Sequence, residues 1–442
     1  MNRATNIFRN MGLVAGLALL AACGDREVIL PGERIDVRSD RVPDNLAPEA
    51  AEVDRAFAMP AQTVLSEWTH ENGSRVHRVD HPALGTQLTR VWSADIGAGN
   101  SRRARISADP VVAGGIVYTL DSSAGVVATS ANGERFWARS LVPEGESDRD
   151  STGGGMAVDG STLYVTSGFG TLTALDARSG AEKWQQDLGA PATSAPTVFD
   201  GLVYTVSRDN KAWALDAQNG RIRWTLQGTP SVTGFEGGSG PAVTDTYAVF
   251  PFSSGELVTA LRQGGVRIWG NQISGDRAGR AYANITDIVA DPVVVDDVIY
   301  TGNQSGRAVA LGLGSGERIW TANEGAYGPV WVSGGSVFLI SDRNELLRLD
   351  AATGARIWGA ELPYYRRERA KRREDIFAHY GPVLAGGRLL VASDDGLIRS
   401  FSPESGQLVG TTELPGGAAS SMAVVNRTLY VVSRNGQLHA FR

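Results

Sequence analysis

LDARSGAEKW, at residues 175–184, is one of three near-copies of a ten-residue phrase. The other two are LDAQNGRIRW (215–224) and LDAATGARIW (349–358), and weaker copies read TSANGERFW (129–137), LRQGGVRIW (261–269) and LGLGSGERIW (311–320). The copies share a Gly-x-x-x-Trp ending, and its tryptophans recur about every 45 residues, which is the blade length of a four-stranded propeller repeat. The repeated phrase therefore predicts an all-β propeller.

The number of copies sets the number of blades. Six copies end in a tryptophan: Trp137, Trp184, Trp224, Trp269, Trp320 and Trp358. A seventh copy keeps Gly406 but has Gly410 in place of the tryptophan, and an eighth stops at Arg442 before its last strand. Trp92, in LTRVWSADI, lies on a last strand that has no blade before it. We therefore predict an eight-bladed propeller with four antiparallel strands per blade, closed by the N-terminal strand, because closure removes exposed sheet edges.

The repeated side chains fit a structural role. Asp176, Asp216 and Asp350 are placed to accept backbone N–H groups across the following turn, where a glycine supplies the positive φ of a short hairpin. The tryptophan that follows lies on the outer strand, where its large apolar surface can cover the next blade. Recurrence in almost every blade favours this structural role over calcium-binding or catalytic carboxylates, which would occur once.

The N-terminus has the pattern of a targeting segment. Arg3 and Arg9 precede an apolar run from Met11 to Ala22, which is too short to span a bilayer and is typical of a signal peptide. The run ends in Leu-Ala-Ala-Cys, which resembles the lipobox of bacterial lipoproteins. That resemblance implies a thioether-linked diacylglycerol and an acylated amine on Cys23, and several chains on one residue anchor a protein stably. Gly24 after the cysteine favours sorting to the outer membrane.

These patterns divide the chain into three parts. We predict a lipoprotein signal peptide over 1–22, the lipidated cysteine and a flexible tether over 23–63, and the propeller over 64–442. The tether is rich in charge, proline and alanine. Cys23 is the only cysteine, so no disulfide forms within one chain, and the net charge of −6 argues against nucleic acid as a partner.

The lipobox, the tether and the eight closed blades together resemble the BamB family of outer-membrane assembly lipoproteins. The resemblance covers residues 84–442 and the lipobox. It implies a non-enzymatic scaffold without cofactor or metal, anchored by lipid to the periplasmic face of the outer membrane of a Gram-negative bacterium. The implied role is support of the folding and insertion of outer-membrane β-barrels. The implied partners are the barrel-bearing, BamA-like subunit of the assembly complex, the membrane and unfolded barrel precursors.

The resemblance also points to partner-binding residues. In DIVADPVVVDDVIY (287–300), Asp287 matches an acidic residue with which the family binds the barrel-bearing subunit. The second binding loop matches TPSVTGFEGGSGP (229–241), where the nearest counterparts are Val232, Phe235 and Glu236. Glu236 stands where the family has an arginine, so the charge is reversed at this position.

Two other function classes stay open. The blade motif is shared by quinoprotein dehydrogenases, but these carry adjacent cysteines and calcium-binding side chains that the sequence does not match. A propeller that binds another cell-envelope component is the third reading, because a fold alone does not define a function.

Two segments stand out by composition. HENGSRVHRVDH (70–81) holds His70, His77 and His81 with Asp80, a spacing that matches no standard metal site, so we expect a solvated connector. The stretch 366–373 has six Lys or Arg in eight positions. It is either a solvated insertion or a contact for acidic lipid headgroups or an acidic partner.

Overall fold

The structure is a computed structural model that describes residues 55–148, 153–192, 194–231, 234, 237–275, 277, 285–367, 369, 373 and 375–442. The signal peptide, Cys23 and most of the expected tether lie outside the described residues. So do Val232, Phe235 and Glu236. The chain divides into the units Met1–Ala47 and Pro48–Arg442, and the described residues belong to the second.

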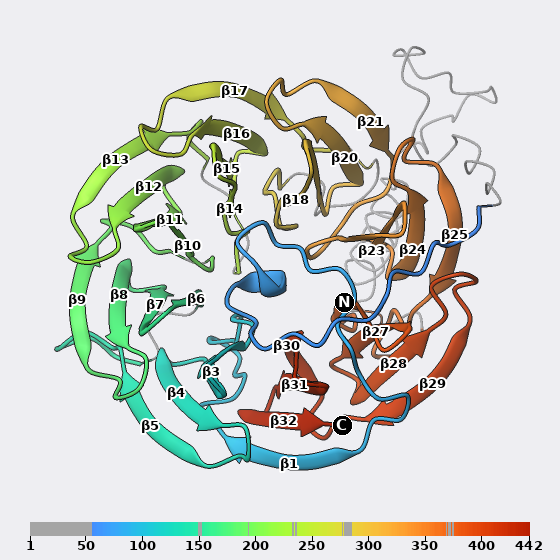
Figure 1. Cartoon of the computed structure of the whole chain (residues 1–442), viewed down its shortest axis with the longest axis horizontal. Coiled ribbons are helices and arrows are strands. Elements are labelled where there is room, and N and C mark those ends of the chain that lie inside the picture. The colour runs from blue at the N-terminus through green and yellow to red at the C-terminus, as the bar shows by residue number, and fades with distance from the viewer. Residues whose placement is uncertain are drawn as a thin grey trace, which may run out of the picture. The chain divides into compact units, whose positions relative to one another are not determined.

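Eight four-stranded antiparallel sheets surround a central axis in the second unit (Figure 1). The predicted propeller with eight blades is confirmed. The described residues include a single helical turn, η1 (Glu71–Gly73). We number the blades 1 to 8 in chain order and describe each from the axis outwards.

The inner strands are β2 (Val111–Ala113), β6 (Gly154–Asp159), β10 (Thr197–Phe199), β14 (Ala242–Val243), β18 (Val293–Val295), β22 (Trp331–Ser333), β26 (His379–Ala385) and β30 (Ala418–Val425). The second strands are β3 (Ile116–Leu120), β7 (Thr162–Ser167), β11 (Leu202–Ser207), β15 (Tyr247–Pro251), β19 (Val298–Asn303), β23 (Ser336–Ile340), β27 (Arg388–Ser393) and β31 (Thr428–Ser433).

The third strands are β4 (Gly125–Ser130), β8 (Thr171–Asp176), β12 (Lys211–Asp216), β16 (Glu256–Leu261), β20 (Arg307–Gly312), β24 (Glu345–Asp350), β28 (Leu397–Phe401) and β32 (Gln437–Phe441). The outer strands are β5 (Arg135–Ser140), β9 (Glu182–Asp187), β13 (Ile222–Gln227), β17 (Arg267–Gln272), β21 (Arg318–Ala322), β25 (Arg356–Glu361), β29 (Leu408–Glu413) and β1 (Arg90–Asp95).

The ring is closed by pairing of the two ends of the propeller sequence. Strand β1 pairs antiparallel with β32, so that Trp92 lies opposite Ala440 and Asp95 opposite Gln437. Blade 8 therefore takes three strands from the C-terminus and its outer strand from near residue 92, as predicted. Opening the ring requires breaking this ladder, because no covalent link holds the two ends together.

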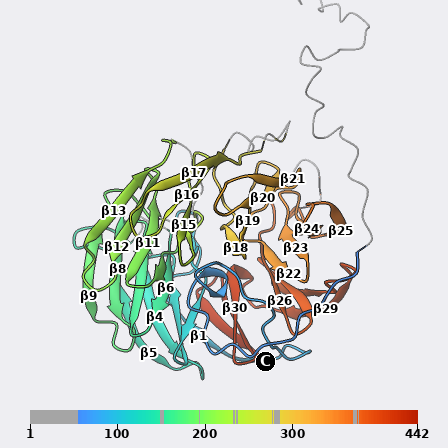
Figure 2. The same cartoon turned by 45° about the horizontal axis from the view of Figure 1, so that its top comes forward.

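Antiparallel order gives the ring two different sides (Figure 2). The hairpin side carries the turns between inner and second strands and between third and outer strands. The loop side carries the turns between second and third strands and the connections from one blade to the next. These names are kept below, since every candidate site lies on one side or the other.

Each tryptophan of the repeat joins its blade to the next. Its indole N–H donates to a backbone carbonyl in the hairpin-side turn of the following blade. The seven bonds are Trp92 to Ala131 (3.0 Å), Trp137 to Ala177 (3.1 Å), Trp184 to Ala217 (3.0 Å), Trp224 to Arg262 (3.1 Å), Trp269 to Leu313 (2.8 Å), Trp320 to Ala351 (2.9 Å) and Trp358 to Pro403 (3.2 Å).

The turn that receives the indole is shaped by the repeated aspartate and glycine. The Asp176 carboxylate accepts the backbone N–H groups of Arg178 and Ser179, at 3.2 and 2.9 Å, and Asp216 and Asp350 accept the matching pairs. The glycine takes a positive φ, +70° at Gly220, and the indole of the preceding blade packs directly on it.

The one blade without a tryptophan has a structural explanation. An indole at Gly410 on β29 would need to pack on the turn between the third and outer strands of blade 8. Blade 8 has no such turn, because its third strand β32 and its outer strand β1 come from distant parts of the sequence, with Phe441 paired opposite Arg90. A Cβ on Gly410 would have no neighbour within 4 Å. The seventh repeat therefore lost its tryptophan where the indole has no partner.

We expect Gly220→Ala to lower the stability of the ring. Its Cβ would lie 2.5 Å from Cε3 of Trp184, and overpacking of this kind costs about 1–3 kcal/mol on top of the strain of a positive φ. Gly160→Ala is the matched control, because Gly160 also has a positive φ but open space around its Cβ. The midpoint of urea denaturation should fall clearly further for Gly220→Ala than for Gly160→Ala. Equal shifts would mean that the indole contact contributes nothing.

Candidate functional site

Within residues 55–89, the part from Trp68 to Leu84 is not a connector beside the ring but lies mostly buried at its centre, whereas residues 58–59, 61–64 and 85–87 are exposed. The segment crosses the open centre of the ring in Figure 1. From Leu65 to Pro82 it follows the inner strands and hydrogen-bonds to blade 8 and then to blades 1 to 7 in turn, and Leu84 forms an isolated parallel bridge with Arg427 of blade 8. The expectation of a solvated connector at 70–81 is wrong.

Backbone groups of the inner strands explain this path. Val112 and Val158 donate their N–H groups to Trp68 and Thr69 at 2.8 and 2.9 Å, and Val243 and Val294 donate to Arg75 and Val76 at 2.8 and 3.0 Å. Blade 6 is reached through Trp331, blade 7 through Gly386 and blade 8 through Asn426. The inner strand of a blade is a sheet edge with unpaired backbone groups, and the segment satisfies them.

The three histidines of the segment are buried hydrogen-bonding groups. The imidazole of His70 lies 2.8 Å from the Thr69 hydroxyl and 3.1 Å from both backbone N and O of Val198 in blade 3. His81 accepts the N–H of Gly387 on Nε2, which leaves Nδ1 to donate to the carbonyl of Pro60. His77 donates through Nδ1 to the carbonyl of Pro292. Both imidazole nitrogens of His70 and His81, and Nδ1 of His77, therefore hydrogen-bond within the ring.

Burial disfavours the charged form of two of these imidazoles, those of His70 and His77. It lowers the pKa of His70 to about 3, with the neighbouring His77 as the next cause, and it lowers the pKa of His77 as well. Among the described residues, no group of three or more His, Cys, Asp or Glu side chains is arranged to hold a metal ion.

Residues 55–57, within the stretch 23–63 that the sequence assigns to the tether, contact the ring. Phe57 packs edge-on against Phe338, with ring centroids 5.5 Å apart, and Arg348 donates to the carbonyl of Ala56 at 3.1 Å. Arg55 pairs with Asp350 in the hairpin-side turn of blade 6. The chain is therefore fixed to the ring from Arg55 onwards.

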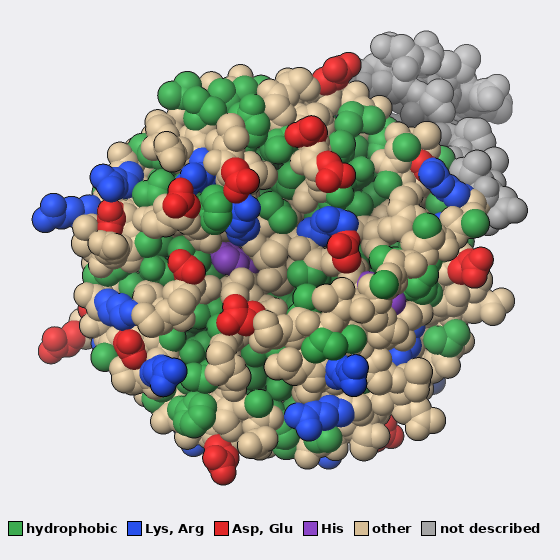
Figure 3. Space-filling model, in the orientation of Figure 1, with side chains coloured by type: hydrophobic (Ala, Val, Ile, Leu, Met, Phe, Trp, Pro, Cys, Tyr) green, Lys and Arg blue, Asp and Glu red, His purple; other side chains and the backbone are tan. Residues whose placement is uncertain are grey.

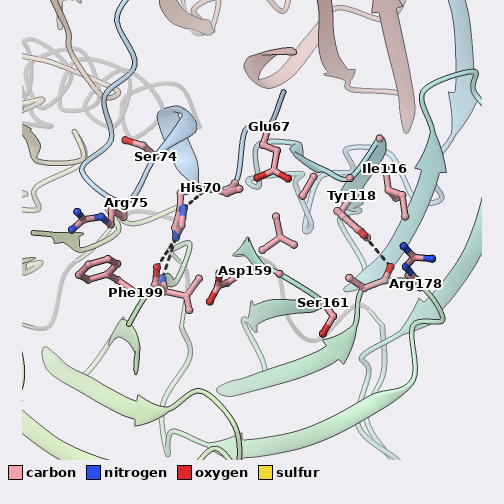
Figure 4. Close-up of a pocket in the computed structure, with 18 of the residues that line it drawn as sticks. Glu67, His70, Ser74, Arg75, Ile116, Tyr118, Asp159, Ser161, Arg178 and Phe199 are labelled. Carbon is pink, nitrogen blue, oxygen red and sulfur yellow. Dashed lines mark hydrogen bonds between the residues drawn. The ribbon is translucent and has the colours of Figure 1, made fainter. Parts of the chain in front are cut away.

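The hairpin side has a depression of about 960 Å³ over blades 1 to 3 (Figure 4). Glu67, His70 and Arg75 line it from the N-terminal segment, and Phe136 and Arg178 are among the residues that line it from the blades. The guanidinium of Arg75 lies 3.7 Å from the centre of the Phe199 ring. Basic and acidic side chains are interspersed over this side (Figure 3), so its surface is neither uniformly positive nor uniformly negative.

The loop side brings the two sequence-predicted binding loops together. A Cβ on Gly234, in the loop 229–241, would lie 3.3 Å from Oδ2 of Asp287. Arg208 donates to the carbonyl of Gly234 at 3.1 Å. Asp287 itself is only 5% exposed, so its carboxylate lies under the first loop and does not project into solvent.

Three carboxyl groups at the axis were missed by the sequence analysis. Glu71, Asp109 and Asp291 surround the base of a cavity of about 370 Å³ that opens to the loop side. Asp109 accepts the N–H of Ser421 at 2.7 Å, and Asp291 accepts that of Gly240 at 2.5 Å. A signal existed, since Asp109 and Asp291 each directly precede the proline that begins an inner strand.

Burial decides the charge of these carboxyl groups. It raises the pKa of Asp109 to about 7, with the nearby Asp291 adding to the effect. Burial likewise raises the pKa of Asp291 and of Glu71, and the negative charges of Asp291 and Asp109 raise that of Glu71 further. Burial and mutual repulsion therefore disfavour three full negative charges in this cluster.

Comparison with known proteins gives one family. The model of the family described as "Outer membrane protein assembly factor BamB" matches residues 123–360 and 368–442. The protein of that name from Yersinia pestis is 27% identical over 360 residues, which cover 80% of this chain and 88% of the relative. The one from Escherichia coli is 25% identical over 366 residues, covering 81% and 90%.

Solved structures agree on the fold. BamB from Moraxella catarrhalis aligns with a TM-score of 0.65 at 18% identity, covering 80% of this chain and all of that one. A quinohemoprotein alcohol dehydrogenase from Comamonas testosteroni aligns with a TM-score of 0.63 at 16% identity, covering 85% and 80%. At such identities the likeness shows the propeller fold alone.

Proposed function

Because this chain belongs to the family of the outer membrane protein assembly factor BamB, and so serves in outer-membrane protein assembly, we propose that it acts as a non-enzymatic scaffold. In this proposal a lipid on Cys23 holds the ring at the periplasmic face of the outer membrane. The loop side binds the barrel-bearing, BamA-like subunit, and unfolded barrel precursors are a second class of partner.

The observation that supports the partner site is the convergence of two loops that are far apart in sequence. Gly234 and Asp287 meet on the loop side, and Arg208 holds the first loop from blade 3. Since Asp287 is buried, we assign it the role of supporting the loop 229–241. In this proposal the neighbouring residues Val232, Phe235 and Glu236 contact the partner directly.

Phe235→Ala combined with Glu236→Ala tests this site. We expect the double variant to reduce co-purification of the barrel-bearing subunit from solubilised membranes at least about tenfold, since aromatic anchors dominate most interfaces. Phe136→Ala is the control, because Phe136 is a 56% exposed aromatic on an outer strand. Equal recovery of the subunit with both variants, at equal expression and unchanged circular dichroism, would reject the site.

Cys23→Ala tests the anchor separately. We expect this variant to move from the membrane fraction to the soluble periplasmic fraction and to lose labelling by radioactive palmitate. Among the described residues, no helix is long and apolar enough to cross a bilayer. Retention of the variant in washed membranes would show that another contact holds the ring there.

The shared fold with quinohemoprotein dehydrogenases is the reason to test the alternative. The residues do not fit such a cofactor site. Cys23 is the only cysteine, so the adjacent pair expected of these enzymes is missing. Around the axis, the N-terminal segment packs against the inner strands, and carboxyl groups with raised pKa values line the base of the loop-side cavity. An absorption spectrum of the purified protein, before and after incubation with the quinone and calcium, should show no bound quinone.

A further inference from the structure

Arginines from three separate loops gather on the loop side. The connection from blade 8 to blade 1 carries Arg102, Arg103 and Arg105, and the connection from blade 6 to blade 7 carries the basic run. Arg434 lies in the turn between β31 and β32. Asn100 donates its N–H to the carbonyl of Arg434 at 2.6 Å, which fixes the first loop against this turn.

One carboxylate joins the second loop to the same cluster. Asp394 pairs with Arg366 and lies 3.9 Å from Arg434. Burial, followed by the positive charges of Arg434 and Arg105, lowers the pKa of Arg366. The three loops therefore form one surface, which we call the arginine surface. Its described members are Arg102, Arg103, Arg105, Arg366, Arg367, Arg369, Arg373 and Arg434.

The arginine surface has an excess of positive charge in a chain whose net charge is −6. The stretch 363–378 has six Lys or Arg against three acidic residues, Glu368, Glu374 and Asp375. Arg102, Arg103, Arg367 and Arg369 are exposed, and within the part of the chain that the structure describes no ion pair involves them.

The arginine surface borders a recess, the loop-side cavity, which has apolar side chains on part of its wall and the carboxyl groups of Glu71, Asp109 and Asp291 at its base. The loop-side cavity of about 370 Å³ is lined by Arg105 at its rim and by Ile106, Ile340, Phe377 and Tyr380, among others. The Phe377 ring lies 5.0 Å from the guanidinium of Arg366. A cavity of this size accepts a large side chain.

We propose that the arginine surface docks an acidic polypeptide segment of a partner, with an apolar side chain of that segment inserted in the recess. Guanidinium groups bind carboxylates through two parallel hydrogen bonds, and all eight described cations are arginines. A flat lipid surface cannot fill the recess. In addition Arg55, where the described chain joins the expected tether, lies at Asp350 on the opposite side of the ring. The proposal does not depend on the site at Phe235.

A labelled peptide with Glu and Asp residues around a single Trp is the probe. We expect binding by fluorescence anisotropy that weakens as ionic strength rises, and that falls about tenfold in the double variant Arg102→Glu, Arg103→Glu, because two attractive charges become repulsive. A peptide with Gln and Asn in place of the acids should not bind, and one with Ser in place of Trp should bind several-fold more weakly.

The matched control places the same charge change on the hairpin side. Arg178→Glu with Arg221→Glu alters two exposed arginines in turns between third and outer strands, and should leave peptide binding unchanged. Equal loss in both double variants would overturn the proposal, since only net charge would then matter. Binding of vesicles containing phosphatidylglycerol that depends on Arg102 and Arg103, without binding of the peptide, would also overturn it and assign the surface to lipid.

Discussion

Trp68→Ala is expected to lower the free energy of unfolding by about 3–5 kcal/mol, the range for loss of a large buried aromatic. Trp68 is 1% exposed and stacks on Trp331, with ring centroids 6.5 Å apart. Its backbone N and O both bond to Val112, at 2.7 and 2.8 Å. The indole therefore fixes the N-terminal segment between blade 1 and blade 6, and its loss leaves a cavity where the segment crosses the ring.

Urea denaturation followed by tryptophan fluorescence and circular dichroism measures this effect. Phe136→Ala is again the control, because removal of a half-exposed ring on an outer strand should cost less than 1 kcal/mol, as is usual for surface changes. A Trp68→Ala variant as stable as wild type would show that residues 55–89 are not part of the folded ring in solution.

Asp109→Asn is expected to stabilise the protein at pH 8, by up to about 4 kcal/mol if the pKa near 7 is fully expressed. The ordinary pKa of an aspartate is 3.8, so the unfolded chain is ionised at pH 8 without cost, whereas the folded chain must hold a buried carboxylate. Asparagine keeps an oxygen to accept the N–H of Ser421 and carries no charge.

The pH dependence of this gain has a definite sign. A carboxyl with a raised pKa contributes its stability at low pH and loses it as the pH rises through the folded pKa. The advantage of the variant should therefore shrink as the pH falls from about 7 towards 4, by about 1.4 kcal/mol per pH unit. His70 acts in the opposite sense, because its lowered pKa costs stability as the pH falls below 6.5.

Asp109 and His70 make the stability change with pH in opposite directions. The stability of the variant must therefore be compared with that of wild type at each pH. Glu134→Gln serves as the control for removal of an exposed acid, since Glu134 lies in a hairpin-side turn and its charge faces water. A constant difference between Asp109→Asn and wild type across this range would mean that Asp109 is ionised throughout.

The repeated phrase was sufficient to predict the blades. Its aspartate, glycine and tryptophan act within one turn and on the next turn along the ring, so their spacing predicts the number of blades, the closing strand and the joints between blades. The glycine at position 410 fits the same rule, because β32 and β1 are not joined by the turn on which an indole there would pack. The lipobox and the partner-loop residues Val232, Phe235 and Glu236 remain predictions, since they lie outside the described residues, and the role of Asp287 remains a proposal.

Only the tertiary structure shows where residues 55–89 lie. The segment has no hydrophobic periodicity, and its polar residues suggest exposure to solvent. In the structure, the backbone edges of eight inner strands surround it. Likewise Glu71, Asp109 and Asp291 come from three distant places, and their raised pKa values arise only where the ring encloses them. The sequence alone predicts the repeated turns, because their residues act locally. It does not predict burial at the axis, because that burial depends on all the blades at once.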